Sequence, residues 1–127
     1  MPHSKLYYLS SADVRRALPM SDAIEAMKQA FAELSAGNAI VPQRIHMPLP
    51  HAGGDVLFMP AAGIDAGQIT MKIITLFEGN HAKGLPFIQA IVVLLDGEDG
   101  RPLAIMDGAS LTAIRTGAAS GAATDLL

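Results

Sequence analysis

The sequence contains no cysteine, so it can form neither a disulfide framework nor a thiolate metal site. No apolar run is long enough to cross a bilayer, and the first residues lack the apolar core and cleavage site of a signal peptide. Together these absences predict a cytoplasmic protein. The net charge of -3 shows no basic surplus, so we expect no nucleic-acid or membrane partner.

The composition indicates one folded domain. The chain has 127 residues, of which 50% are hydrophobic and 17% are charged. This composition disfavours disorder, and the length suits one domain with its own core but is too short for a two-domain enzyme.

Two helical segments are expected near the N-terminus, after a β-prone stretch at residues 7–9. Ser10 or Ser11 can cap a short helical turn, which Pro19 ends. Apolar residues at helical spacing then predict a helix over residues 22–36. We expect Ser21 to be its N-cap, and Met27 and Phe31 to lie in the core.

The middle of the chain has the pattern of a β-sheet. Segments 40–41, 44–47 and 55–59 are separated by prolines and glycines, which are typical of edge strands and bends. Residues 68–77 alternate regularly, so Lys72 projects from a mostly apolar strand face. The other members of that face are Thr70, Ile74 and Leu76.

Residues 87–95 are nearly all apolar, which favours a strand covered on both faces. A turn at 96–100 leads into a second strand at 102–106 and completes a hairpin. With the N-terminal helix and a closing helix, these strands predict an α+β fold with a mixed or antiparallel sheet.

A closing helix is expected over residues 111–126, with Ser110 as its cap. Its residues are mostly small, and Gly117 and Gly121 indicate close packing against another backbone or a ligand. No glycine or proline ends the helix, so we expect an exposed apolar face where a further domain would pack.

Three cations have settings that ordinary surface charge does not explain. Arg44 is expected in a proline-flanked strand, Lys72 among apolar neighbours, and Arg115 on a helix of small residues. The acids nearby in sequence, Asp55, Asp65 and Asp107, could pair with any one of them. Three such cations together favour a carboxylate-binding pocket, because a guanidinium binds a carboxylate through two hydrogen bonds.

Other candidate sites are weaker. His46 and His51 lie in a loop-like stretch that does not align them for a metal, and Asp96, Glu98 and Asp99 lack the spacing of a calcium loop. No metal site is therefore predicted.

Residues 102–118, PLAIMDGASLTAIRTGA, closely resemble a signature of the ornithine cyclodeaminase/mu-crystallin family. The resemblance extends upstream through Met59-Pro60-Ala61, Lys72, Asn80 and Gly84-Leu85-Pro86. It covers roughly residues 40–127, and the first 40 residues fit the family's N-terminal helix less distinctively.

The resemblance implies an NAD(P)-dependent oxidoreductase that acts on the C–N bond of a small amino or imino acid. The enzyme types that the resemblance suggests are ornithine cyclodeaminase, alanine dehydrogenase and ketimine reductase. Residues 1–110 would form a substrate-binding and dimerisation domain whose sheet pairs across a homodimer. Residues 111–127 would be a connecting helix into a nucleotide-binding domain that the sequence does not contain.

The resemblance also assigns roles to residues. Arg44, Lys72 and Arg115 would hold the substrate carboxylate, and Lys72 would be catalytic through its influence on protonation at the imine. Arg115 and Thr116 would border the cofactor, NAD or NADP, which the missing domain mainly binds.

The sequence departs from the family pattern in several places. It has no Gly-x-Gly-x-x-Gly turn, so the 127-residue chain alone is not expected to catalyse. Leu57 stands about where ornithine-type members carry an acid, and Phe87 where some members carry a threonine. Both departures favour the alanine dehydrogenase or ketimine reductase type.

Two other hypotheses remain open. The chain could be a non-catalytic, mu-crystallin-like protein that binds a carboxylate ligand. It could also be an interaction or scaffold domain that derives from the enzyme.

Overall fold

The computed structural model describes residues 5–64 and 67–127, which form seven strands, three α-helices and one 3-10 helix. The strands are β1 (Tyr7–Leu9), β2 (Ala39–Ile40), β3 (Ile45–Leu49), β4 (Gly54–Gly63), β5 (Gln68–Phe77), β6 (Ile88–Asp96) and β7 (Pro102–Asp107). The helices are α1 (Ser11–Ala17), α2 (Met20–Ser35), α3 (Gly108–Leu126) and the 3-10 helix η1 (Glu78–Lys83).

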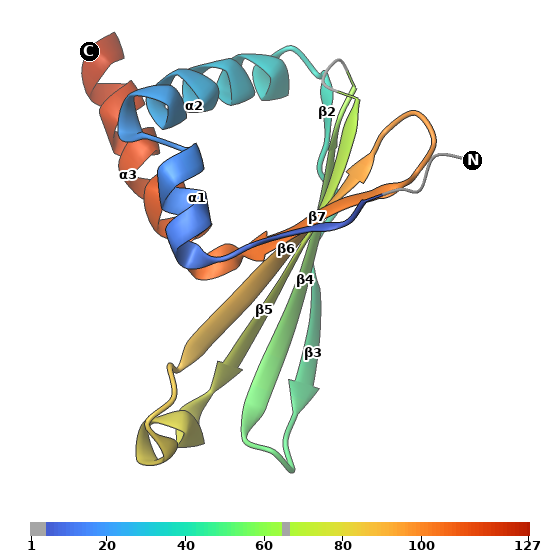
Figure 1. The fold of residues 1–127 in the computed structure, drawn as a ribbon, viewed down its shortest axis with the longest axis vertical. Coiled ribbons are helices and arrows are strands. Elements are labelled where there is room, and N and C mark those ends of the chain that lie inside the picture. The colour runs from blue at the N-terminus through green and yellow to red at the C-terminus, as the bar shows by residue number, and fades with distance from the viewer. Residues whose placement is uncertain (1–4, 65–66) are drawn as a thin grey trace.

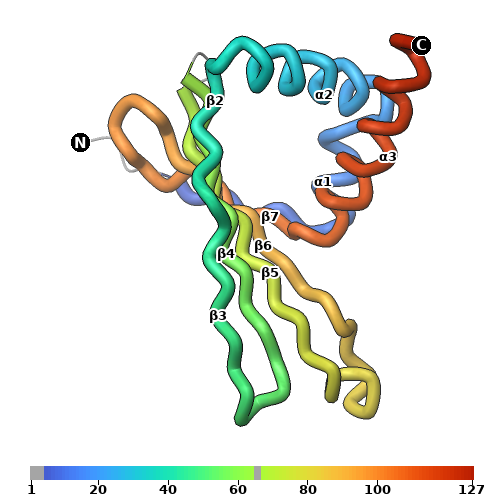
Figure 2. Tube along the Cα trace, turned by 180° about the vertical axis from the view of Figure 1, so that it is seen from behind, coloured from blue at the N-terminus to red at the C-terminus, as the bar shows by residue number. Residues whose placement is uncertain are grey.

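All strands belong to one sheet in the order β1-β7-β6-β5-β4-β2, with β3 also paired to β4. Strands β1 and β7 run parallel, and the other neighbours run antiparallel, so the sheet is mixed as predicted. The three α-helices lie on one side of it (Figure 1). The far ends of β3, β4, β5 and β6 extend beyond the helices (Figure 2).

β5 matches the sequence prediction because its alternation specifies it strongly: it has the predicted bounds. The β6–β7 hairpin forms around the expected turn. β4 extends beyond the predicted segment 55–59 and pairs with β5 without interruption from Gly54 opposite Phe77 to Gly63 opposite Gln68. Pro48 lies on the edge strand β3, which pairs with β4 alone, whereas Pro60 lies within β4.

Two predicted helix caps are wrong. Ser10 does cap α1, but α2 begins at Met20, with Pro19 and not Ser21 at the cap position. The extended backbone of Pro19 lets the helix begin at the next residue, so Ser21 already lies within the first turn of α2. α3 begins at Gly108, because Asp107 accepts a hydrogen bond from the Ser110 backbone N–H at 2.9 Å.

The Ser110 side chain is buried inside the first turn of α3, where it donates a hydrogen bond of 2.6 Å to Asp107 Oδ2. This hydroxyl group is the largest of the causes that lower the pKa of Asp107. An ionised aspartate at the start of a helix also interacts favourably with the helix dipole. Asp107 therefore fixes where α3 leaves the sheet.

Small residues let α3 approach α2 closely, as the glycines predicted. A Cβ added at Gly121 would lie 2.7 Å from Ile24 Cδ1, and one at Gly117 would lie 3.3 Å from Met20 Cε. One cluster of the buried core consists of Val14, Ala23, Ile114 and Ala118, so α3 is part of the core and not only a connector.

The sequence predicts more burial for β6 and for Phe31 than the structure shows. β6 was expected to be covered on both faces, but Ile88 and Ile91 are 49% and 40% exposed. Phe31, expected in the core, is 47% exposed, because α2 packs on α3 and not on the sheet beneath it.

The exposed side of α3 carries small residues such as Ala113 and Ala123, hydroxyl residues, and the charged Arg115 and Asp125. Among the described residues, large apolar groups on α3 and just beyond it are exposed only at Leu126 and Leu127, so the apolar part of this face consists mainly of small side chains. Within the described residues, no helix has the length and apolarity needed to cross a membrane.

Gly108→Ala tests how α3 is seated on the sheet. A Cβ at Gly108 would lie 2.7 Å from Ala90 Cβ and 2.8 Å from the Ala90 carbonyl carbon, and backbone atoms cannot swing aside. We expect the free energy of unfolding to fall by about 1–3 kcal/mol, as overpacking does in other cores. Denaturant unfolding measures the change.

Gly117→Ala is the matched control on the same helix. Its nearest neighbour is the flexible end of Met20, so this change should be neutral or stabilise by up to about 1 kcal/mol through helix propensity. Equal destabilisation by both alanines would contradict a specific contact at Gly108.

Candidate functional site

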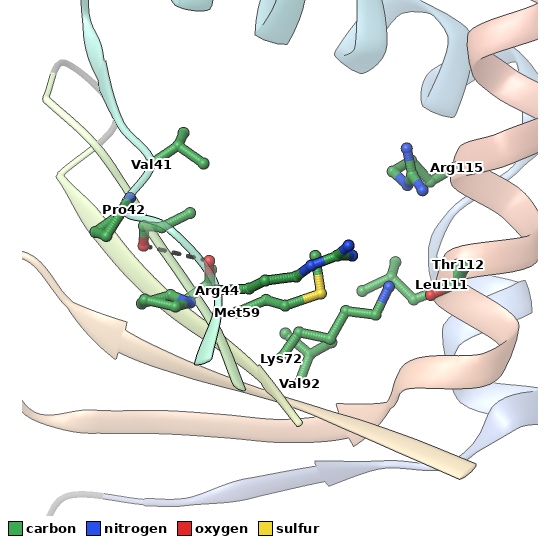
Figure 3. A pocket seen from close by; sticks show the side chains of 12 residues that line it. Val41, Pro42, Arg44, Met59, Lys72, Val92, Leu111, Thr112 and Arg115 are labelled. Atoms are coloured by element: carbon green, nitrogen blue, oxygen red, sulfur yellow. Dashed lines mark hydrogen bonds between the residues drawn. The ribbon is translucent and has the colours of Figure 1, made fainter. Parts of the chain in front are cut away.

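A cavity of about 510 Å³ lies between the sheet and α3. Its cationic and polar lining residues are Arg44, Lys72, Arg115, Thr70 and Thr112. Its apolar lining residues are Val41, Pro42, Met59, Pro60, Ala61, Val92 and Leu111. We call this cavity the cation pocket, because the three cations named from the sequence all line it (Figure 3).

Each cation comes from a different part of the fold. Arg44 lies just before β3, not within a strand as predicted, because Pro42 and Gln43 form a link without ladder pairing. Lys72 lies near the middle of β5, paired with Met59 on one side and Val92 on the other. Arg115 lies on α3 across the pocket from the sheet (Figure 3).

Lys72 is the half-buried member of the set, whereas Arg44 and Arg115 are exposed. Burial lowers the pKa of Lys72 below its ordinary value, and the positive charge of Arg115 lowers it further. The expectation of buried charge thus holds for Lys72 alone. The guanidinium groups of Arg44 and Arg115 are exposed to solvent and accessible to a ligand.

Two of the three acids that could have neutralised these cations bind other groups. Asp55 pairs with His46 at 2.6 Å across β3 and β4, and Asp107 caps α3. Asp65 lies outside the described residues. Among the described residues, no ion pair links an acid to Arg44, Lys72 or Arg115. The pocket is therefore a positively charged cavity with apolar walls, which favours an anion carrying a hydrocarbon part.

Comparison with known proteins identifies the family. The sequence pattern of the ornithine cyclodeaminase/mu-crystallin family matches residues 5–127. The chain belongs to this family.

Three relatives show the range of the ornithine cyclodeaminase/mu-crystallin family. The ketimine reductase mu-crystallin of Mus musculus is 35% identical over 124 aligned positions, and the match covers 94% of this chain and 40% of that protein. The structure of Thermococcus litoralis Delta(1)-pyrroline-2-carboxylate reductase in complex with NADH and L-proline is 39% identical, with a TM-score of 0.84. The match covers 91% of this chain and 36% of that one.

The third relative is an archaeal alanine dehydrogenase, solved as a dimer with bound NAD. It is 34% identical with a TM-score of 0.83, and the match covers 91% of this chain and 35% of that one. The chain thus spans little more than a third of the length of these family members.

Other candidate residues have structural roles or no shared site. His46 pairs with Asp55, and no group of three His, Asp or Glu residues suited to a metal occurs within the described ranges. Asp96 Oδ1 accepts hydrogen bonds from the backbone N–H groups of Glu98 and Asp99 in the hairpin turn. Thr116 does not line the cation pocket, and its hydroxyl donates to the Thr112 carbonyl at 2.9 Å.

The two departures from the family pattern lie at different places. Phe87 stacks on His81, with ring centroids 6.2 Å apart, and lines neither the cation pocket nor the cavity beside it. Leu57 lines that adjoining cavity of about 340 Å³, which shares Lys72 and Thr112 with the cation pocket. Sequence reasoning missed Thr112, because only the seating of α3 on the sheet brings it to both cavities.

Arg115→Gln should raise the pKa of Lys72 part of the way to its ordinary value. Burial, the larger cause of the lowered pKa, remains in the variant, while the repulsion from Arg115 is removed. Titration of the Lys72 side-chain signals by NMR measures the shift. An unchanged pKa would show that the two charges do not interact.

The same shift has a consequence for stability. Between the lowered pKa of Lys72 and the ordinary lysine pKa, the unfolded chain binds more protons than the folded chain. The contribution of Lys72 to the free energy of unfolding therefore increases as the pH rises through this window. This pH window should be narrower in Arg115→Gln, because the pKa of Lys72 then lies closer to the ordinary lysine value.

Proposed function

We propose that the chain is the substrate-binding half of an NAD(P)-dependent oxidoreductase that acts on the C–N bond of a small amino or imino acid. The observation that carries this proposal is the convergence of three cations, with no acid paired to them among the described residues, on one apolar-walled pocket. It is supported by the relatives, which include a ketimine reductase, a Delta(1)-pyrroline-2-carboxylate reductase and an alanine dehydrogenase.

In this proposal Arg44, Lys72 and Arg115 hold the substrate carboxylate from opposite sides. A guanidinium can form two parallel hydrogen bonds to a carboxylate, and the compact Lys72 ammonium adds a third direction of attraction. Contacts from both the sheet and α3 restrict rotation of the substrate about its carboxylate. The α-carbon is thereby presented in one orientation, as a transfer between two bound molecules requires.

The cofactor is NAD or NADP, and when bound it supplies or accepts the hydride at the substrate α-carbon. Arg115 and the exposed Thr116 fit the border of such a site. They lie about one helical turn after Thr112, which lines the cation pocket. The start of α3 is a poor phosphate site, because the negatively charged Asp107 carboxylate already accepts the Ser110 backbone N–H there.

Lys72 is proposed to be the catalytic residue of this chain. Reduction of a C=N bond adds a hydride to carbon and a proton to nitrogen. A lysine whose pKa is lowered by burial and by Arg115 gives up its proton more readily than a solvated lysine. The Lys72 ammonium can therefore bind the substrate carboxylate and also influence the protonation of the substrate imine nitrogen.

For the domain organisation, we propose that residues 1–110 form the substrate-binding and dimerisation domain. Residues 111–127 would then lead into a nucleotide-binding domain, in keeping with the greater length of the relatives. The helix-free side of the sheet exposes Ile45, Ile69 and Ile91, which suits pairing with a second copy. Sedimentation of the natural protein as a monomer at micromolar concentration would exclude the dimer.

The function is tested by the effect of single cations on carboxylate binding and turnover. Arg44→Ala and Arg115→Ala should each weaken binding of pyrrole-2-carboxylate, a planar and stable probe, by about 10- to 150-fold, because each loses charge-assisted hydrogen bonds. NMR titration measures the affinity. Arg101→Ala, which removes a hairpin cation paired with Asp96 and Asp99, is the matched control and should leave binding unchanged.

The natural protein should also show nicotinamide-dependent turnover of small imino or amino acids that Arg115→Ala abolishes. Carboxylate binding without any turnover across such a panel would favour a non-catalytic binding protein instead. Equal binding by the wild type and both pocket variants would refute the carboxylate site itself.

A further inference from the structure

A second cavity adjoins the cation pocket and lies outside the proposed carboxylate site. It measures about 340 Å³ and shares Lys72 and Thr112 with the cation pocket. Its other lining residues are Leu57, Ile74, Leu76, Ile88, Ala90 and Ala109, all apolar. We call it the apolar pocket. Any molecule whose carboxylate meets Lys72 therefore has a hydrocarbon-lined space next to it.

Strand register places this pocket along one face of the sheet. Leu57, Ile74 and Ala90 lie side by side on β4, β5 and β6, two residues along from the row that contains Lys72. Leu76 and Ile88 form the next row. At about 3.3 Å per residue, the Leu57 row lies about 7 Å from the Lys72 row, which is the length of a four- to six-carbon chain.

The charges in the two pockets select among substrate side chains. Among the described residues that line the apolar pocket, Lys72 alone is titratable, and its charge has the same sign as those of Arg44 and Arg115 in the cation pocket. A terminal ammonium on the substrate would meet no acid there and would lose its hydration. A hydrocarbon side chain would instead gain by leaving water.

We propose that the apolar pocket holds the side chain of the substrate, and that the preferred substrates are imino or amino acids with an uncharged hydrocarbon side chain of about three to five carbons. This inference rests on the proposed function, because it takes the carboxylate to lie in the cation pocket. Ile74 and Leu57 limit the size of the side chain, and Ile88 forms the exposed rim.

Simple carboxylates test the proposal without a cofactor or turnover. Acetate, butyrate and hexanoate differ only in the length of the chain, and 6-aminohexanoate adds a terminal ammonium to hexanoate. Affinity measured by NMR titration should rise about two- to fourfold per methylene from acetate to hexanoate, as burial of hydrocarbon predicts. 6-Aminohexanoate should bind at least about tenfold more weakly than hexanoate, because its ammonium lacks a partner.

Ile88→Glu should reverse this preference. Ile88 is 49% exposed, so a glutamate there is compatible with folding and would offer the ammonium of 6-aminohexanoate a counter-charge. We expect hexanoate to bind more weakly and 6-aminohexanoate more tightly than in the wild type. Leu34→Glu introduces the same charge at a 54% exposed site on α2 and should leave both affinities unchanged.

The outcomes separate this inference from the function on which it rests. If all four probes bind with equal affinity and Arg44→Ala still weakens them, the apolar pocket is not the side-chain site, while the carboxylate site stands. If none of the probes binds, both proposals fail. A gain for 6-aminohexanoate in Leu34→Glu as large as in Ile88→Glu would also overturn the inference, because charge anywhere on the surface would then suffice.

Discussion

The close approach of Gly108 to Ala90 is the contact on which the site depends. It lets α3 start directly against β6, because Gly108 has no Cβ that would collide with Ala90. Asp107 fixes the first turn through its hydrogen bonds to Ser110, and the small residues further along α3 let α2 pack against it. Thr112 and Arg115 consequently face Lys72 across a cavity whose sheet wall is held by uninterrupted strand pairing.

This arrangement keeps like charges close together without an acid among the described residues to balance them. The energetic cost is limited because the two arginines remain exposed, and it falls mainly on the half-buried Lys72. A pocket in this state gains most from an anion, which relieves the repulsion between Lys72 and Arg115 and replaces the water around the guanidinium groups. Under the proposed function, that anion is the carboxylate of an amino or imino acid.

The sequence predicted those parts of the fold that local patterns specify. Regular alternation defined β5 to the residue and placed Lys72 on the same face as Ile74 and Leu76. The glycines of the closing helix correctly indicated close packing. The predicted caps Ser21 and Ser110 were wrong, because Pro19 and Asp107, two and three residues earlier, take the cap positions.

Properties that depend on distant segments could not be read from local patterns. Phe31 has the spacing of a core residue but is exposed, since the path of α2 relative to the sheet determines what covers it. The apolar pocket joins residues of three strands and α3, and only strand register together with the seating of α3 reveals it. The three cations could be named, and a shared pocket predicted, from their settings in the sequence, whereas the apolar walls and the volume of the cavity required the structure.

The most direct measurement of the central claim is the pKa of Lys72 with and without a saturating carboxylate such as hexanoate, followed through its side-chain NMR signals. A carboxylate bound beside Lys72 stabilises the ammonium, so the account predicts that the pKa rises toward its ordinary value on binding. An unchanged pKa at saturation would contradict it, because the anion would then lie away from the three cations.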